Sequence, residues 1–162
     1  MKNLEKLVDE LAAIVGPESV MTASDALFQY RVDGVMPKLV VLPRDTNQVA
    51  QVVQAAKREN LTMVPWGNGT KMTMGNPPRR LDLVVCTSRM NHIKDVDTAN
   101  LTITVEAGVK FRDIQARLAT QEDRCYLPLE DLLTEDDEAI CSDRSHSAEY
   151  SRFVVSSVLD SS

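Results

Sequence analysis

The chain has 162 residues, 43% of them hydrophobic, which fits one domain with a sizeable core better than two compact domains. Apolar runs such as Leu39–Leu42 are far shorter than the roughly 18–20 residues of a membrane helix, so we expect no membrane span. The N-terminus leads into a charged amphipathic stretch and not into the apolar core of a signal peptide, which predicts a cytoplasmic protein. A net charge of −6 argues against nucleic acid as a partner.

The acidic charge is concentrated at the C-terminal end. Residues 1–128 carry 16 basic and 15 acidic side chains, whereas residues 129–162 carry 2 basic and 9 acidic ones. The second segment is also rich in serine, lacks glycine, and has a small apolar patch near Val154 and Leu159. This composition predicts a folded domain over 1–128 and an acidic, divergent tail over 129–162.

The cysteines and histidines form no metal-binding or disulfide pattern. Three cysteines are an odd number and show no CxxC spacing, and the two histidines lie far apart in sequence. We therefore predict reduced structural cysteines and no metal site. The residues concerned are Cys86, Cys125, Cys141, His92 and His146.

The first predicted element is a helix over residues 3–15, where apolar residues recur every three or four positions until Gly16-Pro17. Residues 19–36 are weakly patterned, and only a short helical turn near Ala26 is predicted there. A buried strand follows at Leu39–Leu42.

A helix is expected next, capped by Asp45 or Thr46 and running to about Glu59. In the Asp45 register Gln48 would complete a variant of the capping box. A second strand is predicted at Leu61–Pro65, so strand, helix and strand have the order and length of a parallel crossover.

Further along the chain, strands are expected at residues 81–85, 92–96 and 101–106, the last from strict alternation of apolar and polar side chains. A helix over 110–120 and a short strand at 125–128 complete the predicted elements. Together they predict an α+β fold in which a small parallel βαβ unit joins a more antiparallel set of strands.

The clearest candidate site follows the second strand. Gly67 and Gly69 permit positive φ and remove Cβ atoms, so that successive backbone N–H groups can converge on a phosphate. Thr70 offers a hydroxyl donor, Lys71 offers a positive charge, and a pyrophosphate is a suitable guest. The same tetrapeptide also suits an ordinary tight turn, and it is neither a Walker motif nor GxGxxG.

Several motifs follow one another along the chain at compatible spacing. They are Val41-Leu42-Pro43, Val64-Pro65-Trp66-Gly67-Asn68-Gly69-Thr70, Gly75-Asn76-Pro77-Pro78, Leu83-Val84-Val85, Met90-Asn91-His92-Ile93 and Thr104-Val105-Glu106-Ala107-Gly108-Val109. In this order they resemble the N-terminal FAD-binding region of FAD-linked oxidases of the vanillyl-alcohol oxidase and p-cresol methylhydroxylase (PCMH) type, and within them the FAD-binding subunit of glycolate oxidase. The resemblance covers roughly residues 20–128.

This resemblance implies that the amides of residues 67–70 cradle the pyrophosphate of FAD in a PCMH-type FAD-binding domain. Trp66 stands where the family often has arginine, so binding would depend on the backbone. Lys71 would lie near the phosphates or remain solvated. The cofactor-binding residues so predicted are Trp66, Gly67, Asn68, Gly69, Thr70 and Lys71.

The sequence departs from the family after Pro128. The family continues with a second glycine-rich element that completes the flavin site, whereas residues 129–162 contain no glycine. We therefore expect an incomplete domain that binds FAD as part of an oxidoreductase acting on a 2-hydroxy acid, and we assign no catalytic residue. The alternative is a cofactor-free assembly module whose C-terminal segment contacts a partner subunit of an oxidase complex or a second copy.

Overall fold

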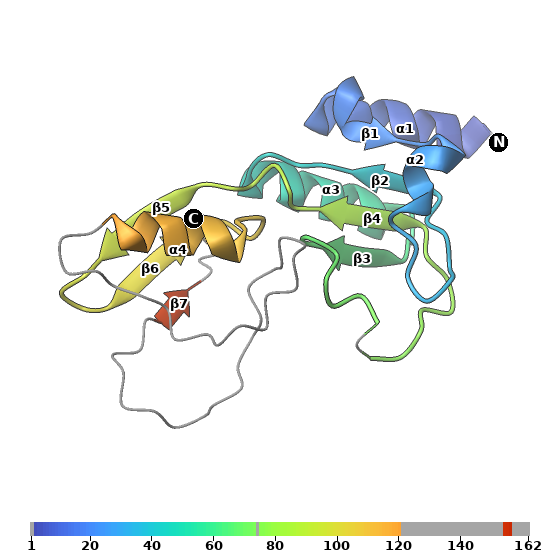
Figure 1. Cartoon of the computed structure of the whole chain (residues 1–162). Coiled ribbons are helices and arrows are strands. Elements are labelled where there is room, and N and C mark those ends of the chain that lie inside the picture. The colour runs from blue at the N-terminus through green and yellow to red at the C-terminus, as the bar shows by residue number, and fades with distance from the viewer. Residues whose placement is uncertain (1, 74, 121–153, 157–162) are drawn as a thin grey trace. The chain divides into compact units, whose positions relative to one another are not determined.

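The computed structural model describes residues 2–73, 75–120 and 154–156 (Figure 1). The chain divides into two compact units, Met1–Met90 and Asn91–Ser162, each with apolar clusters of its own. The predicted boundary between residues 128 and 129 lies outside the described residues and stays a prediction.

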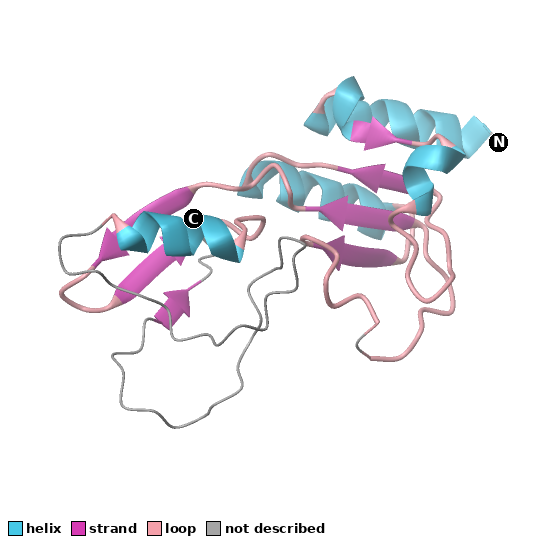
Figure 2. Ribbon diagram, in the orientation of Figure 1, coloured by secondary structure: helices cyan, strands magenta, loops and turns pink. Residues whose placement is uncertain are grey.

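The first unit is built on a four-stranded mixed sheet. Its strands stand in the order β1-β2-β4-β3; β1 is antiparallel to β2, and β4 is parallel to both neighbours (Figure 2). The elements are α1 (Lys2–Val15), a 3-10 turn η1 (Pro17–Ser19), β1 (Val20–Met21), α2 (Ser24–Phe28), β2 (Leu39–Val41), α3 (Thr46–Arg58), β3 (Met63–Trp66) and β4 (Leu83–Cys86).

The predicted parallel strand–helix–strand unit is confirmed, with β4 inserted between its two strands. All four residues of β4 are buried, as a central strand covered on both faces requires. β3 instead carries Pro65, which is exposed and lacks a donor for a further strand, so an edge position suits it.

Helix α3 begins as predicted in the Asp45 register. Asp45 Oδ1 accepts a hydrogen bond from the Gln48 amide at 2.8 Å. The Gln48 side chain differs from a capping box, because its Oε1 accepts from the amide of Arg44 and not from that of Asp45, at 2.9 Å. Both bonds satisfy donors that would otherwise be unpaired at the start of the helix.

Alternate residues of the buried strands face two separate clusters. Leu39 and Val41 of β2 pack with the apolar stripes of α1 and α3, whereas Val40 packs in a second cluster. That second cluster contains residues of the weakly patterned segment as well as the ends of the strands; its buried members are Leu27, Tyr30, Val32, Val40, Leu81, Val84 and Cys86. The site described below lies beside this second cluster.

A buried carboxylate joins the starts of the three parallel strands. Asp82, 1% exposed, lies 2.7 Å from Lys38 Nζ and accepts bonds from Thr62 Oγ1 at 2.8 Å and Arg80 Nε at 2.5 Å. Burial by itself raises the pKa of Asp82, but the bonds from Lys38, Thr62 and Arg80 outweigh it and hold that pKa well below its usual range. The ionised group therefore stabilises this end of the sheet.

The segment 19–36 contains more structure than its sequence indicates. The helical turn near Ala26 is confirmed as α2, but the two-residue strand β1 was not predicted. Two residues are too few to show a period, and β1 is fixed by pairing with Val40 and Val41.

The second unit contains β5 (Ile93–Asp97), β6 (Thr102–Val105), α4 (Phe111–Ala119) and β7 (Val154–Ser156). β5 and β6 are antiparallel, and the predicted alternation holds because Ile103 and Val105 are buried against α4. β7 pairs parallel to β6, which was not predicted for the acidic tail. The predicted strand at 125–128 lies outside the described residues.

Among the helices of residues 2–73 and 75–120, none is long and apolar enough to cross a bilayer.

Candidate functional site at the bend after β3

The bend lies at the carboxyl end of the edge strand β3. The chain leaves the sheet after Trp66, whose carbonyl accepts a hydrogen bond from the Thr87 amide at 2.9 Å (Figure 1). In open sheets of this kind, ligands bind outside the carboxyl ends of parallel strands. The fold therefore places the bend where a ligand is expected.

The two glycines of the bend adopt different conformations. Gly69 has φ +81°, a left-handed conformation that favours glycine. Gly67, where the residue type permits a positive φ, does not adopt one. A Cβ at Gly67 would meet no atom within 4 Å, so at this position the glycine keeps the space in front of the backbone open.

The polar groups of the bend have few partners among the described residues. None of the amides of residues 67–71 donates a hydrogen bond to another described residue. The Thr70 hydroxyl oxygen Oγ1 is buried and also has no partner among the described residues. Because buried polar groups are normally paired, these groups fit an anionic ligand that accepts hydrogen bonds.

A hollow of about 310 Å³ adjoins the bend, near the lower end of the size range of small-molecule sites. Three segments that are distant in sequence form its wall: the residues after α2, the start of the bend, and the end of β4. The residues around it are Gln29, Tyr30, Trp66, Gly67, Asn68, Cys86 and Ser88.

Of the six predicted site residues, Trp66, Gly67 and Asn68 line the hollow, while Gly69, Thr70 and Lys71 do not. No sequence pattern assigned the other four lining residues to the site. Gln29 and Tyr30 come from a weakly patterned segment, Cys86 ends β4, and Ser88 follows it.

The described wall of the hollow carries no formal charge. Burial, together with the neighbouring Cys86 thiol, raises the pKa of Tyr30 to about 12, so its phenol is neutral at ordinary pH. The thiol of Cys86 in turn donates to Ser88 Oγ at 3.3 Å. Hydroxyl, thiol and amide groups are thus available to hydrogen-bond a ligand.

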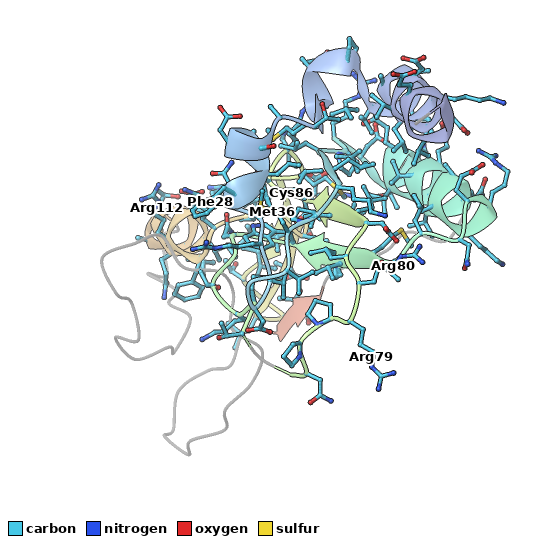
Figure 3. The ribbon with its side chains drawn as sticks, turned by 90° about the vertical axis from the view of Figure 1, so that its right-hand side faces the viewer. Phe28, Met36, Arg79, Arg80, Cys86 and Arg112 are labelled. Carbon is cyan, nitrogen blue, oxygen red and sulfur yellow. The ribbon has the colours of Figure 1, made fainter. Side chains whose placement is uncertain are left out.

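Positive side chains near the bend do not enter the hollow. Lys71 is exposed, and so is Arg79, which extends away from the ribbon in Figure 3. Arg80 instead pairs with Asp82. Any negative charge held by the bend itself would therefore face backbone amides.

The remaining predicted features are structural. His92 is exposed and its Nδ1 lies 2.8 Å from Glu106 Oε2, a pairing that suits a surface hairpin. Cys86 is buried and reduced, as predicted, and no group of metal-ligating side chains occurs within residues 2–73 and 75–120. Cys125, Cys141 and His146 lie outside the described residues.

A family model of the FAD binding domain matches residues 37–130, more than half of the chain. The chain belongs to this FAD-binding family. The predicted resemblance to FAD-linked oxidases is therefore confirmed, and the bend after β3 lies within the matched residues.

Curated relatives agree with this membership. The glycolate oxidase subunit GlcD of Bacillus subtilis is 30% identical over 111 residues, which cover 65% of this chain and 24% of the relative. The D-2-hydroxyglutarate dehydrogenase of Stutzerimonas stutzeri is 28% identical over 114 residues, covering 67% and 25%. The chain thus spans about a quarter of the length of these relatives.

Solved structures show the same fold. A substrate-bound p-cresol methylhydroxylase superposes with a TM-score of 0.66 at 22% identity, over 73% of this chain and 25% of that one. An alkyldihydroxyacetonephosphate synthase gives 0.63 at 23% identity, over 72% and 27%. The α+β architecture is therefore that of PCMH-type FAD-binding proteins, as predicted.

Proposed function

We propose that this chain binds FAD, with the amides of residues 67–70 holding the pyrophosphate. The observation that carries the proposal is that, within the described part of the chain, the bend amides donate no hydrogen bond and the buried Thr70 Oγ1 has no partner. In a chain of an FAD-binding family, this combination is what a backbone cradle for two phosphates requires.

The chemistry of the site suits a pyrophosphate diester. Each of its two phosphates carries one negative charge and offers several acceptor oxygens, which amides and a hydroxyl can satisfy without a charged side chain. The neutral hollow beside the bend, with Tyr30 and Ser88 in its wall, would receive an uncharged part of the same ligand.

Bound FAD would supply the hydride-accepting flavin ring, whereas the residues described here would bind and orient the cofactor. The relatives named glycolate oxidase subunit and D-2-hydroxyglutarate dehydrogenase suggest a 2-hydroxy acid as substrate. We assign no residue of this chain to the transfer step.

A cofactor-free assembly role is the second candidate. It was predicted from the C-terminal segment, of which Val154–Ser156 pair with β6 within the chain. No described contact favours a partner subunit or a second copy, so this role stays an alternative outcome of the test below.

The test is a titration of FAD with the purified chain, followed by flavin fluorescence and by isothermal titration calorimetry. We expect saturable one-to-one binding that ADP competes away, because ADP shares the two phosphates. Unchanged flavin fluorescence and no heat at high micromolar protein would refute the proposal. A colourless, stable dimer in analytical ultracentrifugation would then favour the assembly role.

A further inference from the structure

We propose that Trp66 is a positioning residue that holds the bend in its phosphate-binding conformation through packing against Gly69. The inference rests on the proposed function and gives Trp66, which also lines the hollow, a second role in holding the bend. Its evidence lies in the packing of the indole against Gly69 and Tyr30.

The indole lies against Gly69. A Cβ built at Gly69 would stand 2.8 Å from Cζ2 and 3.0 Å from Cε2 of Trp66, too close for a real side chain. Gly69 also has φ +81°. The glycine is thus needed for its conformation and for the space that the indole occupies.

The indole also meets the ring of Tyr30 in an edge-to-face arrangement, with centroids 5.2 Å apart and planes at 66°. Tyr30 is only 9% exposed, so its ring has little room to move away from the indole. The backbone of Trp66 is fixed as well, since its carbonyl accepts from the amide and the hydroxyl of Thr87 at 2.9 and 3.4 Å. The indole is therefore a fixed support beneath Gly69.

This support matters because the bend has little else to hold it. Its amides at residues 67–71 make no hydrogen bonds to other described residues. A loop that must be ordered when its ligand arrives loses affinity through lost backbone entropy, whereas a preformed loop does not. Packing by Trp66 supplies the order that hydrogen bonds do not.

The first experiment measures the dissociation constant for FAD by calorimetry in Trp66→Ala, Trp66→Phe and, as a control, Phe28→Ala. Phe28 is a 53% exposed aromatic residue outside the lining of the hollow. We expect Trp66→Ala to bind about tenfold more weakly, Trp66→Phe to recover most of that loss, and Phe28→Ala to bind like the wild type. Wild-type affinity in Trp66→Ala would overturn the inference.

The second experiment needs no ligand and compares Gly69→Ala with Gly75→Ala. Both glycines have positive φ, +81° and +102°, but a Cβ at Gly75 meets no atom within 4 Å. We expect Gly69→Ala to lower the melting temperature by several degrees more than Gly75→Ala, and this excess to vanish when both are made in Trp66→Ala. An excess that persists without the indole, or that never appears, would overturn the inference.

The two experiments separate the two proposals. Wild-type protein that binds FAD, together with undiminished binding by Trp66→Ala, refutes the positioning role and leaves the proposed function intact. Wild-type protein that fails to bind FAD refutes the proposed function, and the comparison of Gly69→Ala with Gly75→Ala then decides whether the indole fixes the bend.

Discussion

Tyr30 and Trp66, 36 positions apart in the sequence, meet edge-to-face at 5.2 Å in the wall of one hollow. This contact joins the weakly patterned segment after α2 to the bend that follows β3. It gives the bend a buried aromatic support and makes Tyr30 part of the site.

Replacing Tyr30 by Phe should change the stability of the protein at alkaline pH. The folded-state pKa of Tyr30 is raised from 10.0 to about 12, so the folded state retains the phenolic proton that the unfolded state loses. Stability from this group is therefore present below pH 10 and is lost as pH rises through about 12. Urea titrations of the wild type and of Tyr30→Phe at several pH values measure the free energy of unfolding of each.

Between pH 10 and about pH 12, the wild type should lose about 1–2 kcal/mol of unfolding free energy relative to Tyr30→Phe. The lysines and the other tyrosines titrate equally in both proteins, so they cancel in the difference. A difference that stays constant across this range would show that the Tyr30 phenol is not shielded.

Replacing Thr70 by Val should weaken FAD binding and leave the fold intact. The methyl group keeps the shape, while the buried Oγ1, unpartnered among the described residues, is lost together with its bond to phosphate. We expect a five- to tenfold higher dissociation constant, about 1–1.4 kcal/mol, and a melting temperature that is equal or higher.

The matched control for Thr70→Val is Thr73→Val, a change of the same kind at an exposed position of the same loop. It should leave the dissociation constant for FAD unchanged. Equal effects of the two changes on binding would mean that Thr70 Oγ1 does not contact the ligand.

Replacing Asp82 by Asn should destabilise the first unit and make its free energy of unfolding depend less on pH in acid. Asp82 is ionised among Lys38, Thr62 and Arg80, and its pKa is lowered by their hydrogen bonds although burial opposes this. We expect a loss of about 2–3 kcal/mol at neutral pH, measured by urea unfolding.

The stabilisation by the Asp82 carboxylate should depend on pH. Stability from a carboxylate with a lowered folded-state pKa is present above the unfolded value of about 3.9 and is lost as pH falls below it. The wild type should therefore approach Asp82→Asn in stability below about pH 4. If the difference in unfolding free energy between the wild type and Asp82→Asn stayed the same in acid, the ionised Asp82 would not be what stabilises the wild type.

The regular elements of this fold were predictable because local rules determine them. The Asp45 cap starts α3, and the alternation that buries Ile103 and Val105 marks β6. The insertion of β4 between β2 and β3 was not predictable in the same way, because strand order depends on burial that only the assembled sheet defines.

The candidate site was predictable in part for the same reason. A glycine-rich bend after a strand is visible in the sequence, and so is the role of Gly69. Gln29 and Tyr30 belong to the site only through tertiary contact, and no local pattern marks them. The conformation of Gly67 also followed from its surroundings and not from its residue type.

The backbone cradle is tested most directly by two-dimensional NMR of the ¹⁵N-labelled chain, titrated with ADP and, in parallel, with adenosine. We predict that ADP shifts the amide resonances of residues 67–71 most strongly and that adenosine, which has no phosphates, leaves them in place. ADP shifts that avoid these amides, or no shifts with either ADP or FAD, would contradict the account.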